Sequence, residues 1–72
     1  MSDVRAELSG SVWKIVVQVG DHVERDQEIM ILESMKMEIP VIAPHAGTVT
    51  TLDVVEEATV DDGDLLARIA SE

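Results

Sequence analysis

The chain has 72 residues, enough for one small domain, and its five basic and fifteen acidic residues give a formal net charge of −10. Such a charge repels a phosphate backbone, so nucleic acid is disfavoured as a partner. The absence of cysteine excludes disulfides and thiolate metal sites, and no apolar run or signal-peptide pattern predicts a membrane segment. We therefore expect one domain over residues 1–72, monomeric and cytoplasmic.

The first half of the chain is typical of β-strands, because Val and Ile are abundant and alanine is scarce. Strands are predicted at residues 4–8, 11–19 and 28–34. The Ser9-Gly10 and Gly20-Asp21 pairs mark turns, since glycine and aspartate tolerate the backbone angles that turns require. The first half thus predicts an antiparallel arrangement of short strands.

The second half has the same character. Strands are predicted at residues 37–43, 48–54 and 64–70, with turns at 44–47 and 61–63. Residues 56–60 are expected to form a loop. Pro40 lies inside a predicted strand, and proline cannot donate to a strand ladder, so that strand should be an edge strand or carry a bulge.

The two halves repeat each other at a spacing of 37 residues, without a gap. Identical residues recur in the pairs Val4–Val41, Ala6–Ala43, Gly10–Gly47, Val12–Val49, Val17–Val54, Val23–Val60 and Ser34–Ser71. Chance would not align both glycines together with the paired apolar positions. The repeat predicts two similar units, residues 4–34 and 41–71, packed face to face as an all-β domain of about eight short strands. The midpoint near Lys36 then becomes a hairpin, with the two chain ends at the far end.

The apolar positions that recur in the repeat should form the core. They are Val12, Ile15, Val17, Val23, Ile29, Leu32, Val49, Leu52, Val54, Val60, Leu66 and Ile69. Trp13 alternates with inward residues and is therefore expected to be partly exposed. His22 and His45 lie in predicted turns without metal-ligand spacing, so no metal site is expected.

Residues 33–37 read Glu-Ser-Met-Lys-Met, which places one of the two lysines between two methionines at the predicted hairpin. Methionine usually fills core gaps or lines adaptable binding surfaces. If the hairpin tip is exposed, Met35 and Met37 are positioned to be contacted by another molecule. Two alternatives stay open: Met35 could pack onto the barrel end, and Glu33 could be only a strand-edge charge.

This motif resembles the biotin attachment sequence of the biotinyl domain family, usually written Ala-Met-Lys-Met or Ser-Met-Lys-Met. The likeness extends over residues 10–15, 19–23, 29–37 and 43–49. Members of the family are flattened β-barrels (barrel-sandwich hybrids) of two four-stranded antiparallel sheets with quasi-twofold symmetry. Their target lysine lies on a hairpin. The resemblance implies that biotin is linked covalently to Lys36, with recognition flanks at Glu33, Ser34, Met35 and Met37.

The resemblance also implies a carrier and not an enzyme, with no catalytic residue of its own. A biotin protein ligase would join activated biotin to the Lys36 amine. The biotin would then carry a carboxyl group between biotin carboxylase and carboxyltransferase sites, and the chemistry would belong to the cofactor. Tethering raises the local concentration of biotin at each site without tight protein–protein binding.

The chain departs from the family pattern at two points, which indicate the kind of family member that it resembles. Asp26 stands before Gln27 where the family often has glycine, and we expect aspartate to keep the turn because it tolerates the left-handed region. No segment interrupts the alignment of the halves, so the protruding thumb of some bacterial carriers is absent. The chain thus resembles a thumbless biotinyl domain or a short free-standing biotinylated protein.

Three competing functions remain at this point. Lipoyl carrier domains are similar in fold, but they typically have Asp-Lys-Ala at the target, whereas methionines flank Lys36. An unmodified β-barrel could serve interaction or scaffolding. An oligonucleotide-binding barrel would need several aromatics in a basic groove, which one tryptophan and a charge of −10 disfavour.

Overall fold

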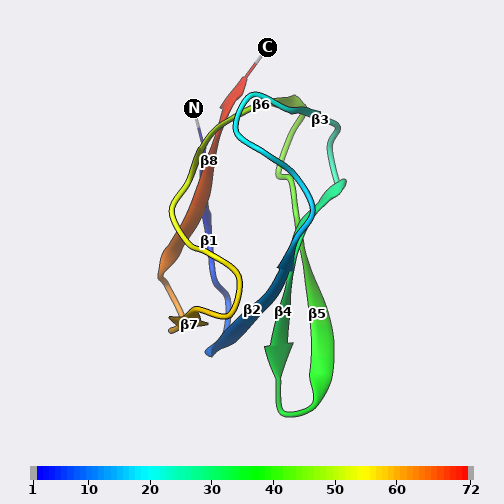
Figure 1. The fold of residues 1–72 in the computed structure, drawn as a ribbon. Helices are drawn as coiled ribbons and strands as arrows, with labels where there is room; N and C mark the ends of the chain where they lie inside the picture. The colour runs from blue at the N-terminus through cyan, green and yellow to red at the C-terminus, as the bar shows by residue number, and fades with distance from the viewer. Residues whose placement is uncertain (1, 72) are drawn as a thin grey trace.

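The protein is all-β, as expected, and its strands form two four-stranded antiparallel sheets (Figure 1). The structure is a computed structural model, and it describes residues 2–71. The first half contributes β1 (Ser2–Arg5), β2 (Gly10–Ile15), β3 (His22–Val23) and β4 (Glu28–Ser34). The second half contributes β5 (Met37–Ile42), β6 (Gly47–Leu52), β7 (Thr59–Val60) and β8 (Leu65–Ser71).

Several predicted boundaries were wrong. The strand expected at 11–19 ends at Ile15, because the chain then leaves the ladder and crosses to the other sheet. The strand expected at 4–8 is β1, which begins at Ser2 and ends at Arg5. The loop expected at 56–60 ends in the two residues of β7, which pair with the start of β2.

Each sheet mixes strands from both halves of the chain. The strand order is β1-β8-β6-β3 in one sheet and β5-β4-β2-β7 in the other. β6 and β8 of the second half therefore form the centre of one sheet, while β2 and β4 of the first half form the centre of the other. Neither half contains a complete sheet, so the halves depend on each other for their backbone hydrogen bonds.

The 37-residue repeat is visible in the backbone hydrogen bonds between strands and loops. The Ala6 amide donates to the Asp64 carbonyl (2.9 Å), and the Ala43 amide donates to the Gln27 carbonyl (2.8 Å), which is the same bond moved by 37 positions. Every bond of this kind between described residues has such a counterpart. The sequence repeat thus corresponds to a twofold relation between the two sheets.

The core confirms most of the predicted inward positions. The buried apolar side chains are Val4, Ala6, Val12, Val17, Val23, Ile29, Met30, Leu32, Ala43, Val49, Val60, Leu66, Ala67 and Ile69. Ile15, Leu52 and Val54, predicted as core, are only partly buried and pack against this cluster. Met30 was missed because the register shifts between Glu28 and Met30, which turns two consecutive residues of β4 inward.

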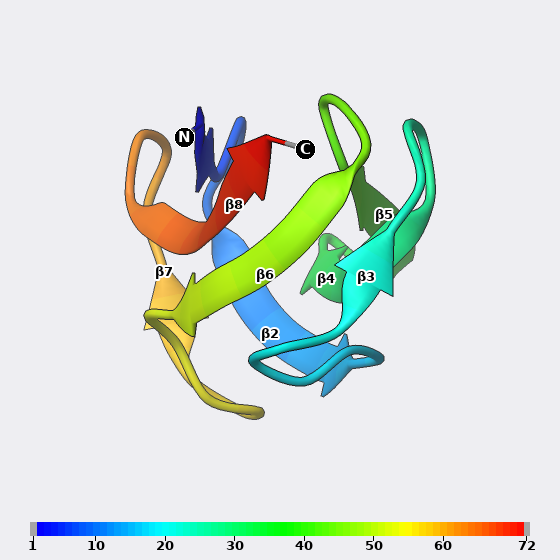
Figure 2. The same cartoon turned by 90° about the horizontal axis from the view of Figure 1, so that it is seen from above.

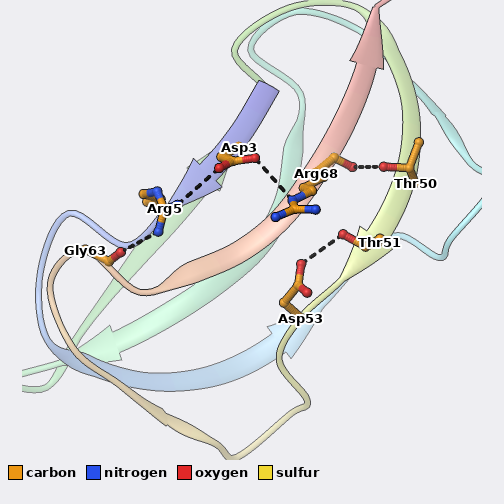
Figure 3. Close-up of polar contacts among 7 residues, drawn as sticks. All are labelled: Asp3, Arg5, Thr50, Thr51, Asp53, Gly63 and Arg68. Carbon is orange, nitrogen blue, oxygen red and sulfur yellow. Dashed lines mark hydrogen bonds and ion pairs between the residues drawn. The ribbon is translucent and has the colours of Figure 1, made fainter. Parts of the chain in front are cut away.

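Two edge strands are protected in different ways. On β1, the Asp3 carboxylate contacts the guanidinium groups of Arg5 (3.1 Å) and Arg68 (3.2 Å), as Figure 3 shows. The Arg5 guanidinium also donates to the carbonyl of Gly63 (3.0 Å), so these contacts tie β1 to β8 and to the loop before it. On β5, Pro40 removes one donor from the edge, in agreement with the prediction that its strand is an edge strand.

The molecule is elongated, with extents of 35 × 17 × 17 Å. The turn between β4 and β5 lies at one end of the long body, and β1 begins and β8 ends toward the other (Figure 1). None of residues 2–71 belongs to a helix long and apolar enough to cross a membrane. The Met35-Lys36 turn, between β4 and β5, thus lies at the opposite end of the long axis from the start of β1 and the end of β8.

Candidate functional site

Met35 and Lys36 form the two-residue turn between β4 and β5, closed by the pairing of Ser34 with Met37. Both turn residues have positive φ, 52° for Met35 and 66° for Lys36. Two-residue hairpins that need positive φ at both positions usually contain Asn-Gly or a similar pair. The chain keeps two long side chains in a backbone conformation that favours glycine, so these side chains serve something other than turn formation.

The side chains at the turn face solvent. Met35 is 90% exposed and Met37 is 59% exposed. Lys36 is exposed too, and its amine makes no hydrogen bond or ion pair with any residue that the structure describes. An exposure of 90% does not fit the alternative in which Met35 packs onto the barrel end. The turn thus presents a primary amine between two exposed thioethers.

The base of this hairpin is held against the rest of the barrel. The Ser34 hydroxyl donates to the Ser9 carbonyl at 2.9 Å. Gly10 also approaches closely, because a Cβ added there would lie 2.5 Å from the Glu33 carbonyl oxygen and 3.2 Å from the Ser34 Cβ. Ser34 therefore turns its hydroxyl toward the base of the hairpin, which leaves the next three residues as the part that projects.

Glu33, two residues before the turn, lies directly across from Glu38 in the β4–β5 ladder. Like charges at opposed positions on one face of a sheet are destabilising. Both carboxylates are exposed, and neither has an ion-pair partner among residues 2–71. The projecting hairpin therefore combines one amine, two apolar side chains and an uncompensated acidic pair.

Asp26 has the backbone conformation that its position requires. Its φ is 68°, and its repeat counterpart Gly63 has a φ of 94°. The Asp26 amide donates to the Ala43 carbonyl at 2.9 Å, and the Gly63 amide donates to the Ala6 carbonyl at 2.8 Å. The expectation that aspartate would preserve this turn is therefore confirmed.

The side chains of both histidines contact other residues of the fold. His45 contacts the Ser2 hydroxyl at 2.7 Å and the Ala46 carbonyl at 2.9 Å. His22 lies beside the Glu24 carboxylate. In the described part of the chain, no three histidine, aspartate or glutamate side chains are grouped so that they could hold a metal ion.

The chemistry open to this hairpin is modification by another protein. An exposed amine on a turn can act as a nucleophile once an enzyme removes its proton, and the firm hairpin base lets that enzyme meet it in one geometry. Covalent attachment through an amide requires only the Lys36 nitrogen, so the turn fits an acyl-linked cofactor. No second titratable group contacts the Lys36 amine among the residues described, so none of these residues is placed to remove its proton.

Comparison with known proteins identifies relatives of this chain. Residues 2–69 match the family model described as "Biotin-requiring enzyme". The "Biotin/lipoyl attachment protein" of Bacillus subtilis (strain 168) is 41% identical over 68 residues, which cover 94% of this chain and 93% of that protein. The "Biotin carboxyl carrier protein" of Streptococcus mutans is 46% identical over 65 residues, which cover 90% of this chain and 50% of that protein.

One solved structure is similar in fold to nearly the whole of this chain. The fold resembles part of the urea carboxylase of Kluyveromyces lactis, with a TM-score of 0.91 and 38% sequence identity. The match covers 96% of this chain but only 6% of that enzyme, so the chain corresponds to a small part of a much longer polypeptide.

Proposed function

We propose that this chain, which belongs to the family described as "Biotin-requiring enzyme", is a biotin carrier in which residues 1–72 form one biotinyl domain and biotin is linked to Lys36. The observation that carries this proposal is the exposed Lys36 amine on a strained turn between two exposed methionines. The names of the relatives, a biotin carboxyl carrier protein among them, support biotin as the cofactor.

Attachment needs a biotin protein ligase, which presents biotin as an activated acyl adenylate. The Lys36 nitrogen attacks the acyl carbon, a carbon–nitrogen bond forms, the bond to the adenylate oxygen breaks, and the amine loses a proton to the ligase. Met35 and Met37 offer the ligase apolar contact on both sides of the lysine. Glu33 adds a charge that a basic ligase surface can read.

The carrier itself catalyses nothing in this scheme. When bound, biotin accepts a carboxyl group at one enzyme and gives it up at another. The chain's own contribution is position: the hairpin holds the attachment point away from the barrel, and the barrel keeps the turn in one conformation. We propose a biotin carboxylase and a carboxyltransferase as partners, in the cytoplasm, with the carrier monomeric because a charge of −10 opposes self-association.

The decisive experiment is Lys36→Arg, coexpressed with a biotin ligase. Arginine keeps the charge but cannot form the amide, so we expect intact mass and a streptavidin blot to show complete loss of biotin with an unchanged far-UV circular dichroism spectrum. Lys14→Arg is the matched control, because it replaces the other lysine of the chain. It should be biotinylated like the parent protein.

The opposite result would be equally clear. Biotin that persists on Lys36→Arg and disappears from Lys14→Arg would move the attachment site to Lys14. An added mass that corresponds to lipoate in place of biotin would make the chain a lipoyl carrier.

A further inference from the structure

A groove of about 330 Å³ lies between β1 and β5, the outer strands of the two sheets. Figure 2 shows β1 next to β8 and β5 next to β4. The residues that line the groove lie between positions 3 and 8 in the first half of the chain and between positions 39 and 44 in the second. Small-molecule pockets usually measure about 300–1,000 Å³, so this space suits a small ligand or one part of a larger one. We refer to it as the β1–β5 groove.

The two walls of the groove are equivalent in the internal repeat, yet they differ in chemistry. At three equivalent positions the first half has a charged side chain and the second half an apolar one, in the pairs Asp3–Pro40, Arg5–Ile42 and Glu7–Pro44. Because the first half forms its wall with charged residues, the repeated fold does not require an apolar wall. The apolar wall therefore points to a contact that only the second half makes.

The apolar wall continues to the Met35-Lys36 turn. β5 begins at Met37, the residue after Lys36. Successive side chains of a strand point to opposite faces, so Met37, Ile39 and Val41 share one face of β5. Ile39 and Val41 line the groove and are partly buried, whereas Met37 is exposed beside the turn. A row of apolar side chains thus leads from Lys36 into the groove.

A biotin group on Lys36 is long enough to reach the groove. A strand rises about 3.3 Å per residue, so Ile39 lies about 10 Å along β5 from Lys36. The lysine side chain and the pentanoyl chain of biotin together extend about 13 Å when straight, by ordinary bond lengths. The fused rings that form the head of biotin can therefore lie level with Ile39 when this arm runs along β5.

The lining of the groove matches the chemistry of the biotin head, which joins a polar ureido ring to an apolar thioether ring. Leu8, Ile39 and Val41 supply apolar surface for the thioether ring and the alkyl chain. Both strands that line the groove are edge strands, and an edge strand presents N–H and C=O groups without a strand partner. Backbone groups of this kind can pair with the N–H and C=O groups of the ureido ring.

We propose that the β1–β5 groove binds the head of the biotin group carried by Lys36 of the same chain, an inference that rests on the proposed function. An open groove of this size would hold free biotin weakly. Attachment to Lys36 gives the head an effective concentration on the order of millimolar, so even a weak site is occupied for much of the time. The carrier then alternates between a form with the head in the groove and a form with the head free to enter an active site. A second copy of the chain is a poorer occupant, because a charge of −10 opposes self-association.

The first test compares two chemically synthesised chains by NMR, one with biotinyl-lysine at position 36 and one with acetyl-lysine. Both residues contain the same amide and lack the lysine charge, but only biotinyl-lysine has the head. We expect the backbone amide chemical shifts of Leu8, Ile39, Val41 and Ile42 to differ between the two proteins. Differences confined to the residues next to position 36 would overturn the proposal. Groove shifts that depend on protein concentration would overturn it too, because a second copy would then be the occupant.

This comparison needs no ligase, so it separates the two proposals. If the groove shifts appear but a biotin ligase does not label Lys36 of the unmodified chain, the proposed function alone is contradicted. If the ligase labels Lys36 but the groove shifts are absent, the groove proposal alone is contradicted.

The second test changes the apolar wall. Pro40→Asp with Ile42→Arg introduces the residues that the first half has at the equivalent positions and leaves the net charge unchanged. Both side chains are exposed, so the thermal midpoint should change little. We expect streptavidin to bind the biotinylated variant about two to three times faster than the biotinylated parent, because a larger fraction of the heads is free. The matched control is Val55→Gln, a repeat exchange at an exposed apolar residue outside the groove, which should react like the parent. An unchanged rate for the double variant, or an equal rise for the control, would overturn the proposal.

Discussion

At the residue scale, the Met35-Lys36 turn must present an acceptor amine, yet its backbone conformation favours glycine. Met35 and Lys36 occupy the left-handed region, which costs a residue other than glycine about 1 kcal/mol or more. Changing only their side chains would relieve this strain, but it would also remove the acceptor amine. The turn is therefore an example of backbone strain retained at a functional position.

This conflict leads to a measurable prediction. Met35→Asn with Lys36→Gly installs the pair that such turns favour, so we expect the free energy of unfolding to rise by about 1–2 kcal/mol. Urea denaturation measures the gain, and intact mass should show no biotin. Lys36→Arg serves as the control, because it also prevents attachment but keeps the strained backbone. A double variant that is less stable than its parent would contradict the strain argument.

The methionines can be separated from the lysine by experiment. Met35→Asp with Met37→Ala imitates the turn of a lipoyl domain, and both residues are exposed, so the thermal midpoint should change little. We expect the rate of biotinylation to fall at least about tenfold, because the ligase loses its apolar contacts. A large loss of thermal stability with unchanged labelling would show instead that the methionines pack against the barrel.

At the element scale, the starts of β2 and β6 are crowded by their neighbours. A Cβ added at Gly47 would lie 1.9 Å from the Ala70 carbonyl oxygen, whereas the same addition at Gly20 meets no atom within 4 Å. Backbone atoms cannot move aside as side chains do. The strand β6 can therefore approach β8 closely only because glycine stands at its first position.

We expect Gly47→Ala to lower the free energy of unfolding by about 2 kcal/mol or more, since the added methyl group forces β6 away from β8. Gly20→Ala provides the comparison, where only the left-handed backbone is unfavourable and the loss should be near 1 kcal/mol. Guanidinium denaturation of both variants tests the order. Equal losses would mean that β8 relaxes easily around the methyl group.

Local sequence pattern predicted the boundaries of β4 correctly, and the repeat predicted that Lys36 lies on a hairpin. β7 was missed because two residues are too few to show a period. Met30 was missed because a bulge interrupts the alternation on which the core prediction depended. The firm base of the hairpin depends on contacts between distant residues, such as Ser34 with Ser9, which no local pattern reveals.

At the scale of the whole molecule, the two halves are interlocked by their strand order. Each sheet takes its central strands from one half and its outer strands from the other. An isolated half would expose the apolar face and the unpaired edges of two central strands without their partners. Folding should therefore be a single event for the whole domain.

We expect a peptide of residues 1–37 to show no cooperative unfolding transition and no β-sheet circular dichroism spectrum when it is monomeric. The intact chain should unfold in one step whose midpoint is the same by fluorescence of Trp13 and by circular dichroism. A folded half, or two separate transitions in the intact chain, would contradict the interlocked arrangement.

The position of the attachment turn also determines reach. Lys36 lies near one end of a body 35 Å long, while β1 begins and β8 ends near the other (Figure 1). A linker joined to either terminus would therefore be attached at one end of the barrel, and the cofactor would lie at the opposite end. The barrel then adds most of its own length to the distance that the cofactor can reach from the point where the linker is attached. A carrier of this shape can serve two active sites farther apart than its linker and lysine side chain alone would span.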